Sequence, residues 1–149
     1  MIQEAQSYHL KDVLRLSYEY YQTSPMVDRI EFNQDYAMDY LRRQMIQSSS
    51  YFPVYSIDDK AQGFAIAYLS AYPFSKDTRV NLEYIYVNKE HRSADVGQQL
   101  VQAVEAWAQS QNSRELLTGD IGIDPEVLKR WYQGQGYTYD GVCMTKRLR

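Results

Sequence analysis

The sequence predicts a single mixed α/β domain with a mostly antiparallel central sheet and flanking helices. Some segments carry apolar residues at helical spacing, whereas others alternate apolar and polar residues or run continuously apolar. The segment 80–118 has the pattern strand–helix–strand, which predicts a parallel pair joined by a right-handed crossover. With 149 residues and no long linker, we expect one domain over 1–149 in the order β-α-α-β-β-β-α-β-α-β-β.

The first part of the chain predicts an edge strand and two helices, over residues 1–6, 8–22 and 33–47. Ser24-Pro25 should end the first helix, because proline disfavours helical geometry in the residue before it. Asn33 should begin the second helix, because its side chain can accept a hydrogen bond from an unpaired backbone N–H group.

Three strands should follow, over residues 52–57, 64–70 and 80–87. The first two predict a hairpin across a turn at 58–63, where polar residues and a glycine cluster. The third strand is apolar on both faces, which favours a central place in the sheet.

The rest of the chain predicts two helices separated by a short strand and followed by a hairpin. The first helix should run from about Val96 to near Asn112, and the strand should cover 116–118. Asp124-Pro125 is a typical start for the second helix. The final hairpin should pair 137–139 with 142–148 around Asp140-Gly141.

Composition weighs against several classes of function. The net charge of -3 and the pI of about 5.4 weigh against a nucleic-acid binder and suit a cationic substrate. No apolar run approaches a membrane span, and the N-terminus lacks the pattern of a signal peptide. A lone cysteine, Cys143, suits a reducing, cytoplasmic setting, and its place in a late strand predicts a buried structural thiol. His9 and His91 are too isolated to predict a metal site.

A basic turn between the third strand and the next helix predicts an anion site. The first N–H groups of a helix have no intrahelical partner, and the helix dipole adds partial positive charge there. The turn reads Arg92-Ser93-Ala94-Asp95-Val96-Gly97, and a later segment reads Tyr132-Gln133-Gly134-Gln135-Gly136-Tyr137. These two motifs, with the order of elements, resemble the GNAT family of N-acetyltransferases.

The resemblance implies acetyl-coenzyme A as the acetyl donor. The residues that would hold its pyrophosphate, mostly by backbone N–H groups, are Arg92, Ser93, Ala94, Asp95, Val96, Gly97 and Gln98. The backbone of Ile85, Tyr86 and Val87 would bind the pantetheine arm where this strand splays from 116–118. Tyr132 would lie near the thioester sulfur and act as general acid.

Glu83 is the candidate general base, since it is the one charged residue of an otherwise apolar strand. Strict alternation would place it on the opposite face from Tyr84 and Tyr86, unless a β-bulge intervenes. The expected acceptor is a primary amine on a small metabolite, a peptide N-terminus or a lysine. Tyr20, Tyr21, Asp28 and Tyr72 are candidates for selecting a cationic acceptor. The oligomeric state stays open, with a homodimer among the options.

Two departures from the family pattern leave a second hypothesis open. Asp95 stands where the family has the first glycine of its motif, and Pro125 stands near the place of an asparagine that helps hold the cofactor in many relatives. A carboxylate close to two phosphates adds like-charge repulsion. The alternative is therefore a degenerate member of the fold that serves as a binding or regulatory module.

Overall fold

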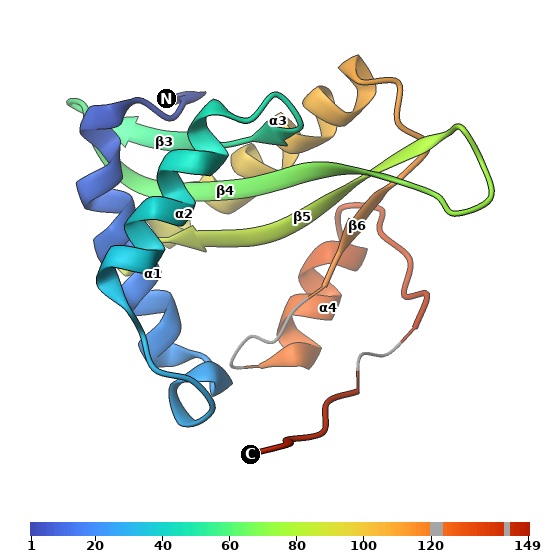
Figure 1. Cartoon of the computed structure of the whole chain (residues 1–149). Coiled ribbons are helices and arrows are strands. Elements are labelled where there is room, and N and C mark those ends of the chain that lie inside the picture. The colour runs from blue at the N-terminus through green and yellow to red at the C-terminus, as the bar shows by residue number, and fades with distance from the viewer. Residues whose placement is uncertain (120–123, 142–143) are drawn as a thin grey trace.

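A six-stranded sheet forms the centre of the molecule (Figure 1). The structure, a computed structural model, describes residues 1–119, 124–141 and 144–149. The sheet has the order β1-β3-β4-β5-β6, and β2 pairs with β4. Every pair is antiparallel except β5 with β6. The elements are β1 (Ile2–Glu4), α1 (Leu10–Thr23), α2 (Gln34–Ile46), β2 (Ser50–Tyr51), β3 (Pro53–Ile57), β4 (Lys60–Ala71), β5 (Thr78–Val87), α3 (Val96–Ser110), β6 (Leu116–Thr118) and α4 (Pro125–Gln133). This arrangement confirms the predicted fold class.

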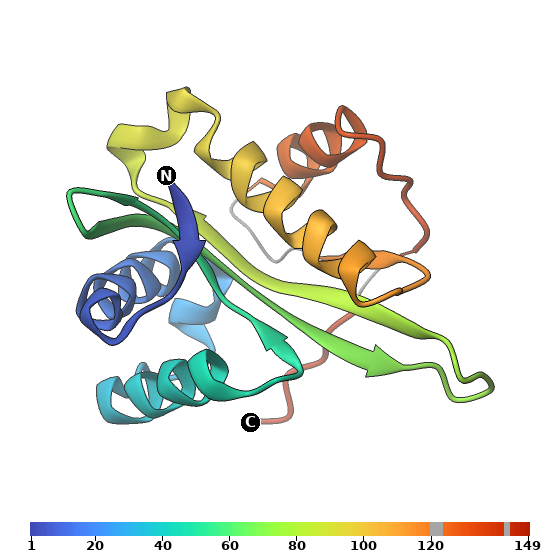
Figure 2. The same cartoon turned by 90° about the horizontal axis from the view of Figure 1, so that it is seen from above.

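Helices cover both faces of the sheet (Figures 1 and 2). On one face, α1 and α2 enclose a core that includes Leu16, Leu41 and Ile66. On the other face, α3 and α4 enclose a second core built around Leu100 and Val104. These two sides of the sheet are called the α1/α2 face and the α3/α4 face.

The predicted starts of α2 and α4 are confirmed, and each has a local capping residue. Asn33 Oδ1 accepts a hydrogen bond from the Tyr36 N–H at 2.9 Å and begins α2. Asp124 Oδ1 accepts one from the Val127 N–H at 3.2 Å and begins α4. Within the described ranges, no helix is long and apolar enough to cross a membrane.

The β3–β4 hairpin is tighter than the predicted turn at 58–63. Asp58 and Asp59 have φ angles of 50° and 63°, and Ile57 already pairs with Lys60. Both central residues of such a two-residue turn need positive φ, which aspartate tolerates better than most residues. The strand therefore begins at Lys60 rather than at Phe64.

The predicted C-terminal hairpin is wrong for the residues that the structure describes. Neither 137–141 nor 144–149 contains a strand, while Val142 and Cys143, with the expected structural thiol, lie outside the described residues. Met144 and Leu148 are 84% and 89% exposed. With so little apolar surface buried, nothing offsets the conformational entropy lost on pairing.

His9 is fully buried at the start of α1, and we expect it to make stability depend on pH. Burial lowers its pKa from the ordinary 6.5, while the charges of Asp12 and Asp59 oppose the shift. The unfolded chain therefore binds the proton more tightly. The stabilisation is complete above about pH 6.5 and is lost as the pH falls below it.

Urea unfolding between pH 7 and pH 5.5 should accordingly show a falling free energy of unfolding. The decline should be shallower in His9→Gln, in which position 9 no longer titrates. His91→Gln changes the other histidine and should keep the steep dependence of the unsubstituted protein. Equal slopes in all three proteins would contradict the assignment to His9.

Candidate active site

A β-bulge in the middle of β5 sets the orientation of the site. Ile66 pairs with Tyr84 and Ala67 pairs with Leu82, so Glu83 is an extra residue without a cross-strand partner in the β4–β5 ladder. The bulge shifts the alternation, because Tyr84 packs against the α1/α2 core whereas Leu82 lies in the α3/α4 core. Glu83 is exposed at this point and is not enclosed by the apolar side chains of the strand.

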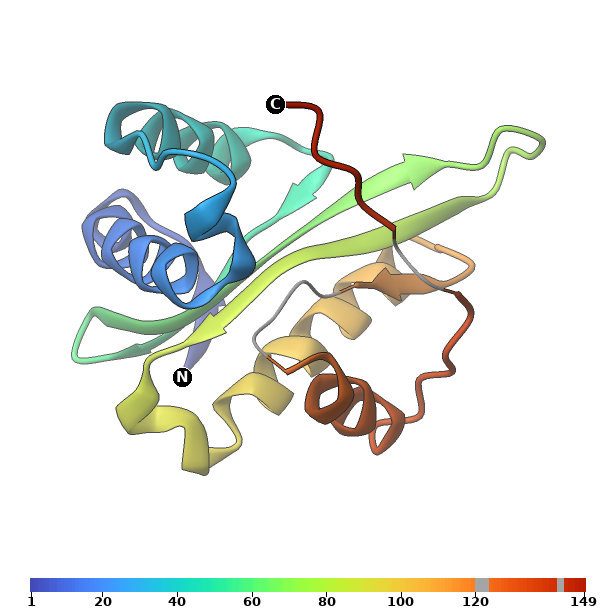
Figure 3. The same ribbon diagram turned by 90° about the horizontal axis from the view of Figure 1, so that it is seen from below.

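The two parallel strands pair over only three residues. Val80, Asn81 and Leu82 pair with β6, which ends at Thr118, while β5 continues to Val87. The segment Glu83–Val87 thus runs past the end of its parallel neighbour (Figure 3). At the end of β6, the Thr118 hydroxyl is buried without a hydrogen-bond partner among the described residues.

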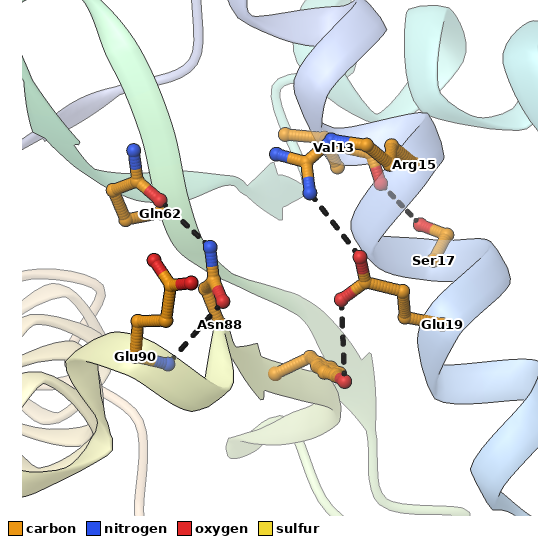
Figure 4. Close-up of polar contacts among 8 residues, drawn as sticks. Val13, Arg15, Ser17, Glu19, Gln62, Asn88 and Glu90 are labelled. Carbon is orange, nitrogen blue, oxygen red and sulfur yellow. Dashed lines mark hydrogen bonds and ion pairs between the residues drawn. The ribbon is translucent and has the colours of Figure 1, made fainter.

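A short 3₁₀ helix, Lys89–Ala94, links β5 to α3 and is held by Asn88 (Figure 4). The Asn88 side-chain amide donates to Gln62 Oε1 at 3.0 Å, and its Oδ1 accepts from the Glu90 N–H at 3.3 Å. Asn88 therefore ties the start of this turn to β4. In the same view, Glu19 of α1 pairs with Arg15 at 3.2 Å.

Asp95 adopts the left-handed conformation between the 3₁₀ helix and α3, with φ 56° and ψ 22°. This geometry lets the chain turn sharply into α3, and it is one that aspartate tolerates. Its exposed side chain makes no capping hydrogen bond to α3. Its side chain therefore leaves the first N–H groups of α3, starting at Val96, uncapped, as an anion site requires.

Arg92 is anchored at the C-terminal end of β5. Its Nε donates to the Val87 carbonyl oxygen at 3.0 Å, and its guanidinium lies 5.1 Å from the centre of the Tyr86 ring. Burial raises the pKa of Tyr86, and the charge of Arg92 opposes this shift. The Tyr86 hydroxyl in turn donates to Glu19 Oε2 at 3.5 Å.

Tyr132 lies on α4 and is buried, with only 6% of its surface exposed. Its ring makes edge contacts with Trp131 and Tyr137, at centroid distances of 4.9 and 5.2 Å. Trp131 also packs against the first turn of α3, since a Cβ atom added at Gly97 would lie 3.2 Å from its ring. The absent side chain at Gly97 thus lets α4 approach the turn.

These elements enclose a cleft of about 680 Å³. The predicted site residues that line it are Glu83, Ile85, Tyr86, Val87, Arg92, Asp95, Gly97, Gln98 and Tyr132. Ser93 is exposed on the 3₁₀ helix outside this lining, and Ala94 ends that helix. Val96 is fully buried in the α3/α4 core, so only its backbone is available to a ligand.

Several residues of the site were not predicted from the sequence. Thr118 and Trp131 line the cleft, although Trp131 had the pattern of a core residue. Of the tyrosines expected to select a cation, Tyr20 lines the cleft, whereas the hydroxyls of Tyr21 and Tyr72 bond to the Ile30 carbonyl and to Glu115. No local pattern marks Thr118, because its role depends on where β6 ends.

Comparison with solved structures identifies the same fold in several proteins. A transcriptional regulator from Bacillus halodurans C-125 superposes with a TM-score of 0.80 at 15% identity, covering 98% of this chain and 99% of that one. The aminoglycoside N-acetyltransferase AAC(6')-Iy, in complex with CoA, gives 0.78 at 21% identity, covering 100% and 94%. A ribosomal-protein-alanine N-acetyltransferase from Brucella melitensis biovar Abortus 2308 gives 0.74 at 18% identity, covering 99% of each chain.

The sequence itself was compared with curated proteins and with family models. The comparison with curated protein sequences gave no significant match. The model of the acetyltransferase (GNAT) family matches residues 10–137, which is most of the chain. The fold, the cleft beside the C-terminal part of β5 and this match agree, and the protein belongs to the acetyltransferase (GNAT) family.

Proposed function

We propose that this acetyltransferase uses acetyl-coenzyme A and transfers the acetyl group to a primary amine by direct attack. The observation that carries the proposal is one cleft that joins the α3 turn, the part of β5 beyond the end of β6, and Tyr132. A lone cysteine also suits the reducing cytoplasm as its location.

The residues of the cleft fit the parts of coenzyme A. The N–H groups at the start of α3 and the guanidinium of Arg92 suit the pyrophosphate. The backbone of Ile85–Val87, beyond the end of β6, offers polar groups to the amides of the pantetheine arm. The buried hydroxyl of Thr118 gains a hydrogen-bond partner from a polar group that enters the cleft.

The chemistry assigns one proton transfer to each of two residues. Glu83 takes a proton from the acceptor ammonium, directly or through water, and the free amine attacks the thioester carbonyl carbon. A carbon–nitrogen bond forms, the nitrogen of the intermediate releases its second extra proton to solvent, and the carbon–sulfur bond breaks. Tyr132 donates its proton to the departing thiolate and regains one from solvent.

A regulatory or binding module is the second candidate, and Asp95 favours it. The exposed carboxylate lines the cleft where the pyrophosphate would lie, and like charges repel. This candidate predicts weak or absent cofactor binding in an otherwise intact fold.

Isothermal titration with acetyl-coenzyme A tests the two candidates directly. We expect a dissociation constant well below about 1 mM, because a cleft of this shape can hold both the pyrophosphate and the arm. S-acetylpantetheine lacks the pyrophosphate, so its dissociation constant should be at least about tenfold higher. Thiol release with a panel of primary amines then measures transfer. No binding at millimolar concentration would remove the catalytic proposal and leave the module.

A further inference from the structure

A second pocket, of about 360 Å³, lies against the cleft on the α1/α2 face. It is formed by the C-terminal half of α2, by β4 and by the bulge of β5, and Glu83 and Tyr84 line both the pocket and the cleft. The two cavities therefore meet at the bulge. A ligand that reaches from one to the other passes the Glu83 carboxylate.

The pocket wall combines three tyrosines with one carboxylate. Tyr40 comes from α2, Tyr68 from β4, and Tyr84 and Glu83 from β5. The rings of Tyr40 and Tyr84 are 6.2 Å apart and nearly perpendicular, at 86°. Burial raises the pKa of Tyr68, and the nearby Glu83 charge adds to this shift, so the carboxylate lies beside the aromatic wall.

The charges of the wall favour a cation. Burial raises the pKa of Tyr40 and of Tyr84, and the nearby Glu83 charge adds to both shifts. All three phenols are therefore neutral at pH 7, and Glu83 carries the formal charge of the described lining residues. Arg43 and Arg79 lie outside this lining, and Arg79 instead stacks over the Tyr72 ring at 5.2 Å.

Aromatic faces beside a carboxylate are the usual surroundings of a bound ammonium group. A volume of 360 Å³ is at the lower end of the range for small-ligand sites and suits an alkylammonium chain. We propose that this pocket, the ammonium pocket, holds a second, protonated amino group of the acceptor while the reacting amine lies in the cleft. The acceptor class is then a small compound with at least two amino groups.

This inference rests on the proposed acetyl transfer and names its acceptor, so the test separates the two. Butane-1,4-diamine and butylamine differ by one ammonium group, and the KM of the unsubstituted protein for the diamine should be at least about tenfold lower, or 1.4 kcal/mol. Equal KM values would overturn the inference and leave acetyl transfer intact.

Gln44 provides a matched pair of variants in the pocket wall. Its side-chain oxygen accepts a hydrogen bond from the Ser50 hydroxyl at 2.8 Å, which Gln44→Lys and Gln44→Met both remove. Both variants lose this bond, so the KM for the diamine should be about tenfold higher in the lysine variant than in the methionine variant because of the added charge. The KM for butylamine and the affinity for acetyl-coenzyme A should not differ between the lysine and methionine variants. A rise in KM that is equal for both amines would contradict the ammonium pocket.

Calorimetric titration of the protein with butane-1,4-diamine alone keeps the test independent of turnover. Binding that is weaker in Gln44→Lys than in Gln44→Met supports the pocket even if no amine is acetylated. Absence of diamine binding in the unsubstituted protein overturns it. Failure of acetyl-coenzyme A to bind would count against the proposed function and not against the pocket.

Discussion

Replacing Tyr132 by phenylalanine should lower kcat by about 100- to 1,000-fold, the usual contribution of a positioned general acid. The ring would remain packed against Trp131 and Tyr137, so the dissociation constant for acetyl-coenzyme A should stay within about twofold. The thiolate would then have to leave without a proton from α4. Steady-state thiol release and titration of the cofactor measure the two quantities.

Tyr137→Phe is the matched control for this substitution. Its ring contacts Tyr132 at 5.2 Å, and its hydroxyl donates to Glu105 at 3.0 Å, away from the proposed reaction. Loss of that hydrogen bond should cost about 1 kcal/mol of stability and little activity. If both variants lose turnover equally, packing of α4 and not proton donation explains the effect. Unchanged turnover in Tyr132→Phe would remove Tyr132 as an essential acid.

Replacing Asp95 by glycine should tighten acetyl-coenzyme A binding by about 10- to 100-fold. Two unit charges about 4 Å apart repel by roughly 4 kcal/mol at an effective dielectric of 20, and exposure to solvent reduces this value. Glycine removes the carboxylate and accepts a φ of 56° without a steric cost. Calorimetric titration at low and high salt measures the gain, which should shrink as salt screens the charge.

Asp95→Asn separates the charge from the backbone. Asparagine also tolerates the left-handed conformation, so this variant keeps the turn and removes only the negative charge. It should recover most of the gain in affinity. If the unsubstituted protein binds the cofactor and neither variant binds it more tightly, repulsion at this position does not limit binding. If the unsubstituted protein does not bind and neither variant restores binding, the cofactor site has been lost elsewhere, and the module becomes the better account of the chain.

Local signals explain which parts of the fold could be predicted from the sequence. Asn33 and Asp124 each satisfy N–H groups of the helix that follows them, so the helix starts are encoded within a few residues. The anion turn is similarly local, because a strand end and a helix start suffice to build it. The C-terminal hairpin had an equally strong turn signal in Asp140-Gly141, but its strands need a surface on which to bury Met144 and Leu148.

The parts of the site that escaped prediction depend on how distant segments pair. The bulge at Glu83 exists only relative to Ile66 and Ala67 on β4, so the strand's own pattern leaves its position undetermined. Tyr40 and Tyr68 lie on different elements and meet only because α2 packs across the sheet. The chain has fifteen tyrosines, and no local pattern distinguishes these two from the others.

The packing of Trp131 against Gly97 joins the proposed phosphate turn to the helix that carries the proposed acid, Tyr132. Trp131 rests on the turn, and Tyr132 is its immediate neighbour in α4. Because protein interiors are close-packed, a shift of α3 or of α4 is transmitted to the other helix. The distance between the turn proposed to hold the cofactor's charge and the hydroxyl proposed to protonate its sulfur therefore depends on the thickness of one side chain, the Trp131 ring.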